Sequence, residues 1–350
     1  MADKSEYDLV ETVTRTVEQR FEDAQLPFFQ RLVEQPSCSR EPDDVEAAAR
    51  IVDAQADALG MSRRLHPDPE KRFADHRVYA TPAVKDDGRA IALVGHVDTV
   101  FPRELGFFGF RRDGDVVHGP GVLDMKSGLS CILFALDAIR HVSPDTYHAL
   151  PVRFACNTDE EMGSPSSRGM YEALAPLTTE ALVFEAGRAK DRIVTRRKGG
   201  LVLDVEVTGK AAHAGNNHED GVSAIHALSL LVPRFEALTD YERGMTINVG
   251  LMQGGSAKNT VPAWAWCELD GRFLRAEDGE ALLGEVRRIC ASPDLPGRLG
   301  PVDIAVTGGI TRPPMEATDA SQRLRARYEA EAGAVGLGTG EAPLQGGGSD

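Results

Sequence analysis

The feature that most constrains the fold of this 350-residue chain is a set of three apolar, strand-like runs. Each run ends in side chains that can bind a metal. The runs begin at Ile91, Val152 and Ala181. Parallel strands of an α/β sheet end at one edge, and ligands bind in the crevice beyond that edge. The pattern therefore predicts an α/β fold with a mixed, largely parallel sheet, helices on both faces, and a functional site at the carboxyl ends of the strands.

The first run, residues 91–100, reads IALVGHVDTV and has His96 and Asp98 near its end. Side chains two positions apart in an extended strand point to the same face, so these two are expected to emerge together. Taken alone, a buried histidine paired with a neighbouring acid explains the stretch equally well. The later runs make a functional interpretation stronger.

Four acids follow in the later segments. Asp124 comes immediately before a helix predicted from the apolar stripe of residues 129–139. The second strand leads into Glu160 and Glu161, and the third ends at Glu185. Asp124 could instead cap the helix, which is a common use of aspartate, and charges often mark where buried strands reach water. These alternatives explain one or two such acids well, but an ordered series less well.

Together these side chains have the composition of a two-metal site. Imidazole and carboxylate bind zinc at about 2.0–2.2 Å, and a carboxylate can bridge two ions about 3.5–4 Å apart. Asp98 is suited to accept a hydrogen bond from the other histidine nitrogen and fix its tautomer. Of the adjacent Glu160 and Glu161, one can coordinate while the other acts as a general base toward water. One imidazole and three carboxylates would come from His96, Asp124, Glu161 and Glu185.

Composition and charge exclude several classes of protein. A net charge of −15 and a pI near 5.1 argue against nucleic acid or an anionic membrane as a partner. The chain has no run of 18 apolar residues, and its N-terminus lacks the apolar stretch of a signal peptide. Its five cysteines are scattered, without a CxxC pair, which favours reduced thiols. We therefore expect a cytoplasmic protein.

The second half of the chain has a different pattern. Strand-like segments with alternating apolar and polar residues, as in sheets with one wet face, are separated by two amphipathic helices. The resulting order, β-α-β-β-α-β, is typical of a ferredoxin-like domain. The predicted segments are residues 201–207, 221–238, 246–252, 263–269, 278–290 and 302–306.

A chain of this length is long for one hydrophobic core and suits two domains. We predict that residues 1–198 form the first part of a catalytic, metal-binding domain. Residues 199–309 are predicted to be an inserted domain, and residues 310–350 the second part of the catalytic domain.

Seven motifs in a fixed order give the chain a family resemblance. It resembles the co-catalytic zinc aminoacylase/carboxypeptidase family, which includes glutamate carboxypeptidase, acetylornithine deacetylase and succinyl-diaminopimelate desuccinylase. The resemblance extends from about residue 90 to the end and is strongest to the glutamate carboxypeptidase branch, chiefly through NTDEEMGS. The motifs are GHVDTV, GPGVLDMKSG, NTDEEMGS, FEAG, TGKAAHAG, NTVPAWAWCELDGR and GGGSD.

The resemblance implies roles for the candidate metal ligands. His96 and Glu185 would bind one zinc ion, Glu161 the other, and Asp124 would bridge them. Glu160 would be the general base. The family would thus supply two Zn²⁺ per subunit, and Co²⁺ or Mn²⁺ can substitute at carboxylate-rich sites.

The resemblance also implies a homodimer through the inserted domain, which matches the family's lid or dimerisation domain. His213 would reach the partner subunit's active site and polarise the scissile carbonyl. Asn259 and Arg272 would bind the substrate carboxylate, with Gly347 and Gly348 lining the same pocket. Without the resemblance, His213 reads as a surface-loop histidine and Arg272 as a charge at the end of a strand.

One departure from the family concerns the second metal, which a histidine beyond the GGG[ST]D loop completes. The sequence has no histidine after His226 and stops at Asp350. We expect a chain truncated at its C-terminus. The alternative is a form with an impaired second site.

The predicted function is that of a di-zinc hydrolase acting on a small peptide or an N-acyl amino acid. It would cleave the amide or peptide bond next to a C-terminal amino acid, with glutamate the favoured one and Glu160 as general base. One alternative is an N-acyl amino acid deacylase, and another is a non-catalytic metal- or peptide-binding relative. A third is a two-domain α/β protein whose acids merely end its strands.

Overall fold

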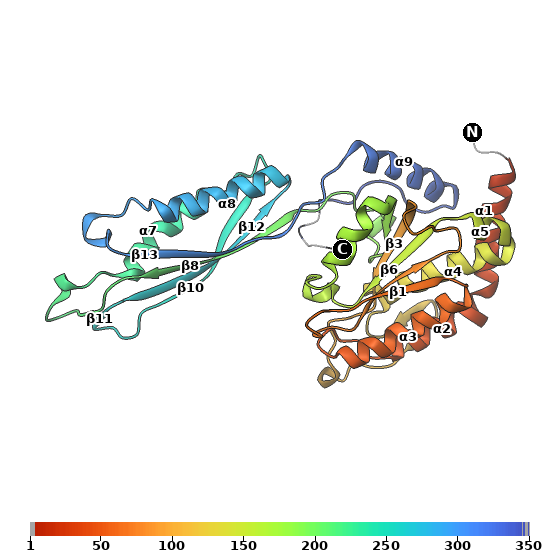
Figure 1. Ribbon diagram of the computed structural model, residues 1–350, viewed down its shortest axis with the longest axis horizontal. Coiled ribbons are helices and arrows are strands. Elements are labelled where there is room, and N and C mark those ends of the chain that lie inside the picture. Colours follow the sequence, from red (N-terminus) through yellow and green to blue (C-terminus); the bar gives the residue numbers. More distant parts are fainter. Residues whose placement is uncertain (1–3, 345, 347–348, 350) are drawn as a thin grey trace. The chain divides into compact units, whose positions relative to one another are not determined.

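The computed structural model describes residues 4–344, 346 and 349, and the side chains from Leu9 onward within them. These residues form two compact units (Figure 1). The first comprises residues 4–187 and 349, and the second comprises residues 188–344 and 346. The domain boundaries after residues 198 and 309 stay predictions.

A five-stranded mixed sheet forms the centre of the first unit. Strand β3 lies between β6 and β7 and runs parallel to both. Strand β2 pairs antiparallel with the other edge of β6, and β1 pairs antiparallel with β2. The three apolar runs that begin at Ile91, Val152 and Ala181 therefore lie in adjacent parallel strands, which confirms the predicted fold class. In spatial order the strands are β1 (Ser62–His66), β2 (His76–Ala80), β6 (Val152–Asn157), β3 (Ala90–His96) and β7 (Thr178–Val183).

Helices cover both faces of this sheet. The larger core, which includes Phe28, Leu129 and Phe154, packs helices against one face, and a smaller cluster around Met170 packs against the other. The helices are α1 (Lys4–Arg20), α2 (Leu26–Glu34), α3 (Pro42–Ala58), α4 (Ser127–Val142), α5 (Pro144–Ala149) and α6 (Arg168–Leu174), and the hairpin β4 (Arg111–Asp113) with β5 (Val116–His118) completes the unit.

Local structure agrees with the sequence patterns where they are strongly periodic. Helix α4 contains the predicted 129–139 stripe, and a π-helical segment, Phe21–Gln25, lies between α1 and α2. Strand β1 was not predicted, because it is an exposed edge strand whose polar sequence, SRRLH, lacks an apolar face.

Gly128 lets α4 approach the end of β7 closely. A Cβ atom at this position would overlap the Phe184 carbonyl oxygen. Since Glu185 follows directly, this contact fixes the beginning of α4 beside one predicted metal ligand. Close backbone approach of this kind is a common reason for glycine.

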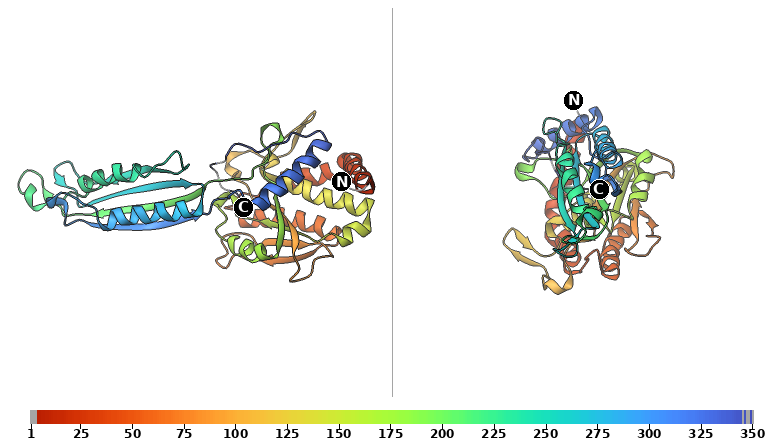
Figure 2. Two further views of the ribbon diagram at one scale, coloured as in Figure 1. Left: turned by 90° about the horizontal axis from the view of Figure 1, so that it is seen from above. Right: turned by 90° about the vertical axis from the view of Figure 1, so that its left-hand side faces the viewer.

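The second unit contains a four-stranded antiparallel sheet in the order β10-β12-β8-β13. Helices α7 (Ala224–Glu236) and α8 (Ala276–Ala291) lie side by side on one face of it (Figures 1 and 2). This is the predicted β-α-β-β-α-β arrangement. The strands are β8 (Gly199–Thr208), β10 (Thr246–Gly254), β12 (Trp264–Phe273) and β13 (Asp303–Arg312).

Three further elements belong to this unit. A short ribbon pairs β9 (Ala212–His213) with β11 (Thr260–Val261), and α9 (Asp319–Ala334) follows the sheet. Within the described part of the chain, no helix is both long and apolar enough to span a membrane.

Candidate metal centre

His96 stands at the centre of the candidate site. It is the last residue of β3 and is completely buried. Its Nδ1 atom lies 3.0 Å from the Asp98 main-chain oxygen and 3.3 Å from Asp98 Oδ1. Its Nε2 atom lies 3.2 Å from Asp124 Oδ1 and 3.7 Å from Glu185 Oε1. One imidazole nitrogen therefore faces the protein, and the other faces the predicted ligands.

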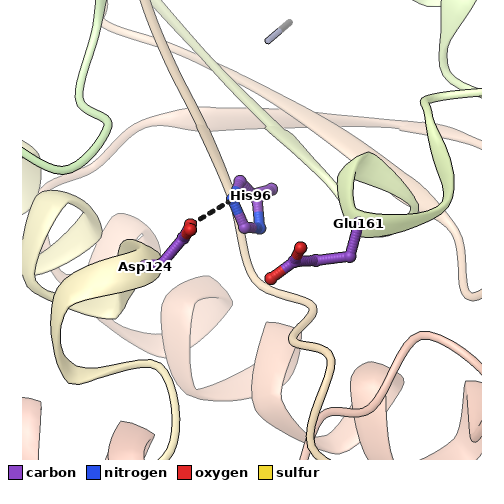
Figure 3. Close-up of side chains that lie close together, drawn as sticks. All are labelled: His96, Asp124 and Glu161. Atoms are coloured by element: carbon purple, nitrogen blue, oxygen red, sulfur yellow. Dashed lines mark hydrogen bonds and ion pairs between the residues drawn. The ribbon is translucent and has the colours of Figure 1, made fainter. Parts of the chain in front are cut away.

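All four predicted ligands, and Glu160, gather around this imidazole. Atoms of His96, Asp124 and Glu161 lie within 4.8 Å of one another and point toward a common space (Figure 3). His96, Glu160 and Glu185 form a second such group by the same distance. The structure thus unites residues from the ends of β3, β6 and β7 with one from the segment before α4.

Asp124 does not act as the N-cap of helix α4. Helix α4 begins at Ser127 after Lys126, and no side chain caps it. The Asp124 carboxylate instead contacts His96, and 58% of its side chain is exposed. The alternative in which Asp124 is a helix cap is therefore excluded.

The electrostatics of the cluster suit a cation. Burial lowers the pKa of His96, but hydrogen bonds to Asp124 and Asp98 and the nearby negative charges outweigh burial and hold that pKa well above its ordinary value. Burial raises the pKa of Glu161 to about 7; His96 opposes this rise, and the charges of Asp124, Asp98 and Glu185 add to it.

This donor set fits divalent metal ions. Carboxylates crowded around one imidazole repel one another, and a bound cation would relieve that repulsion. Imidazole and carboxylate are the donors that zinc and related ions accept in catalytic sites. The raised pKa of Glu161 is what such a cluster shows without a cation.

Asp98 and Ser39 are buried next to the cluster, and Asp98 binds its main chain. Ser39 Oγ donates to Asp98 Oδ2 at 2.6 Å. The main-chain N–H groups of Glu160 and Glu161 donate to the same carboxylate at 3.3 and 3.2 Å. Ser39 did not emerge from the sequence, where the motif PSCS gives no signal of a contact with a residue 59 positions away.

Lys126 is a second residue that the sequence did not single out. It is completely buried, and its Nζ donates to the Gln35 main-chain oxygen at 2.8 Å. Burial lowers the pKa of Lys126 to about 7. This bond ties the start of α4 to the loop that follows α2.

The candidate residues of the second unit lie at two ends of its sheet. His213 and Asn259 are neighbours, since Thr260 pairs with His213 and the Asn259 main-chain oxygen accepts from Ala214. Arg272 lies at the other end of β12 from this ribbon. The ten residues of β12 span roughly 30 Å at about 3.3 Å per residue. The unit therefore does not bring Arg272 together with His213 and Asn259.

Arg272 and His213 both form hydrogen bonds within the second unit. The Arg272 guanidinium donates to Asp270 through Nε at 2.8 Å and Nη2 at 2.7 Å. The Nδ1 atom of His213 accepts the Gly215 N–H at 3.2 Å, so a neutral ring carries its proton on Nε2. The predicted positions Gly347 and Gly348 lie outside the described residues.

Comparison with known proteins places the chain in a family. Residues 195–298 match the Peptidase dimerisation domain family of M20 peptidases. The chain is 30% identical to carboxypeptidase G2 of Pseudomonas sp. (strain RS-16) over 332 residues, which cover 93% of this chain and 77% of that enzyme. It is 32% identical to the acetylornithine deacetylase of Myxococcus xanthus over 188 residues, 49% of this chain and 47% of that enzyme.

A solved structure shows the same fold. The M20 family metallo-carboxypeptidase Sso-CP2 from Sulfolobus solfataricus has a TM-score of 0.66 at 17% identity, covering 93% of this chain and 87% of that chain. The chain belongs to the M20 peptidase family, and it is a hydrolase of the metallopeptidase and amidohydrolase class.

Proposed function

We propose that this protein is a di-zinc carboxypeptidase that hydrolyses the amide bond before a C-terminal amino acid with a free carboxylate. The observation that carries the proposal is the convergence of His96, Asp124, Glu161 and Glu185 around one space, with Glu160 beside them. A glutamate leaving group is favoured by the likeness of NTDEEMGS to the glutamate carboxypeptidase branch.

In this proposal the four ligands divide between two ions. His96 and Glu185 would hold one ion, Glu161 would hold the other, and Asp124 would contribute a carboxylate to both. The distances from His96 Nε2 to Asp124 and to Glu185, 3.2 and 3.7 Å, support this division. Bound divalent ions would polarise the scissile carbonyl and lower the pKa of water.

Glu160 is proposed to take the proton from the attacking water and deliver it to the leaving nitrogen. General bases of this kind must lie within hydrogen-bond reach of the water. The main-chain N–H of Glu160 donates a hydrogen bond to the Asp98 carboxylate, which lies beside His96. This bond supports a fixed position for Glu160. Asp98 also accepts from His96 Nδ1, so it would orient both the ligand and the base.

His213 and Asn259 are proposed to serve the active site of a partner subunit in a homodimer. Two observations support this. They lie at the other end of β12 from Arg272, and the match to a peptidase dimerisation domain covers this region. The Nε2–H of His213 would donate to the carbonyl oxygen under attack, and Arg272 would bind the substrate carboxylate as a guanidinium fork.

Deacylation of N-acyl amino acids is the second candidate, because a 32% identical relative is an acetylornithine deacetylase. Both reactions break an amide bond to an amino acid and differ in the acyl side. The test is metal analysis of the protein combined with hydrolysis assays on N-acyl amino acids and glutamyl-terminated peptides. Hydrolysis that requires two zinc ions per subunit is expected. A metal-loaded protein that hydrolyses neither substrate class would refute the proposal.

A further inference from the structure

The motif Asp159-Glu160-Glu161 contains three consecutive acids, and the first has a different environment from the other two. Asp159 is completely buried. Its Oδ2 accepts the N–H groups of Ser166 and Ser167 at 2.7 and 3.1 Å. Its Oδ1 accepts the Ser167 hydroxyl at 2.6 Å and the Asn157 amide at 3.4 Å. Three of these donors belong to Ser166 and Ser167, and the fourth belongs to Asn157, the last residue of β6.

These contacts occupy the Asp159 carboxylate. A carboxylate has about four lone-pair sites, and four donors of the protein are directed at this one. It therefore has no capacity left for a metal ion. Of the three acids, only Glu160 and Glu161 contribute to the groups of possible ligands around His96.

The main chain of Asp159 closes the same turn. Its carbonyl oxygen accepts from Met162 at 3.1 Å and from Ser164 at 3.0 Å. The main-chain oxygen of Asp159 thus binds the middle of residues 160–167, and its side chain binds their C-terminal end. Asp98 binds the first two of these residues, through the N–H groups of Glu160 and Glu161.

A buried polar chain anchors this turn to strand β2. Thr158 Oγ1 donates to the Ala74 main-chain oxygen at 2.6 Å and lies 2.9 Å from His76 Nδ1. The His76 Nε2 atom lies 3.0 Å from Ser166 Oγ. Because Thr158 and His76 are almost fully buried, these bonds fix the turn against the interior of the unit.

We propose that Asp159 is a positioning residue for Glu160 and Glu161. Its carboxylate accepts hydrogen bonds from Asn157, Ser166 and Ser167, and these bonds fix the turn that carries the two glutamates. The inference rests on the proposed function for the roles of the two glutamates. Neither glutamate needs a contact with Asp159 itself, because the turn transmits the restraint.

The first test is Asp159→Asn, which keeps the shape but directs an NH₂ group at N–H and hydroxyl donors. A displaced catalytic group about 1 Å from its place can cost about 100-fold in rate. We expect kcat to fall by roughly 10- to 100-fold with KM within about threefold. Cobalt titration followed by absorption should show weaker binding of the second Co²⁺ equivalent, since Glu161 moves.

A matched pair of variants separates positioning from stability. Ser167→Ala and Tyr147→Phe each remove one fully buried hydroxyl that donates a single hydrogen bond, to Asp159 Oδ1 at 2.6 Å and to the Leu59 oxygen at 3.0 Å. The Ser167 hydroxyl also accepts a hydrogen bond from the Asn157 amide at 3.2 Å. Both should lower Tm, but only Ser167→Ala should lower kcat. The pair also tests the proposal if Asp159→Asn fails to fold.

The outcomes distinguish this inference from the proposed function. If Ser167→Ala and Tyr147→Phe change kcat equally, or if folded Asp159→Asn keeps kcat or second-site cobalt affinity within twofold of wild type, Asp159 is not a positioning residue. If wild-type protein hydrolyses no substrate, the proposed function fails. The cobalt titration alone then decides the role of Asp159.

Discussion

The candidate metal cluster and the substrate candidates of the second unit differ in how the fold holds them. His96 and the supporting residues Asp98 and Asp159 are fully buried and bonded to neighbouring groups, and only Asp124 of the predicted ligands is largely exposed, at 58%. His213 is exposed, and 40% of the Arg272 side chain is accessible. A cluster fixed by its own protein is ready for chemistry before substrate arrives. In our proposal, the exposed residues of the second unit complete a site only with substrate or a partner subunit.

The largest expected effect is that of Asp124→Ala. If Asp124 bridges both ions, its removal should abolish activity and the binding of both metals, because neither ion keeps its shared ligand. Metal content by mass spectrometry and kcat on a hydrolysed substrate provide the measurement. A variant that retains one tightly bound ion and measurable activity would show that Asp124 is not a bridge.

Glu160→Gln should have a different signature within the same cluster. We expect a loss of about 10²- to 10⁴-fold in kcat, the usual contribution of a general base. Metal content should stay near wild type, because Glu160 is not proposed to be a ligand. Equal loss of metal and activity would reassign Glu160 as a ligand.

Mixing subunits tests whether the exposed His213 needs a partner. His213→Ala and Glu160→Gln are each inactive in the proposal, but their heterodimer contains one site with both residues intact. Random exchange should therefore restore roughly a quarter of wild-type activity. As a control, Glu160→Gln mixed with Asp124→Ala should show no recovery, since both changes lie in the metal cluster. A confirmed His213→Ala heterodimer without activity would remove the shared site.

The smallest effect expected is a pH dependence of metal binding. Protons on Glu161, whose pKa is about 7 without metal, compete with the ion. Metal affinity should therefore fall as pH drops below about 7. In the metal-free protein the sign for stability is opposite: the folded state binds more protons than the unfolded state between about pH 4.5 and 7, so stability should decrease as pH rises. Metal titrations and thermal unfolding at several pH values measure both.

The sequence alone determined the parts that local patterns encode. Apolar runs predicted β3, β6 and β7, and the polar residues that follow them predicted the acids near His96. Alternating apolar and polar residues in the strands, together with apolar stripes on the helices, predicted the ferredoxin-like unit. A strand with one solvated face and one buried face shows a period of two in its sequence. These features follow from short-range geometry, which a single stretch of sequence contains.

Only the tertiary structure decided which acids lie together around His96 and which acids hold the neighbouring main chain in place. Asp159 and Glu160 are adjacent in the sequence, yet the carboxylate of Asp159 is filled by four donors, while Glu160 joins His96 and Glu185. Ser39 reaches Asp98 because an isolated parallel bridge pairs Cys38 with Thr99, which lie far apart in the chain. Such contacts depend on the pairing of segments far apart in the chain, so no local pattern carries them. The sheet that places His96 at its carboxyl edge also brings Glu160, Glu161 and Glu185 toward it.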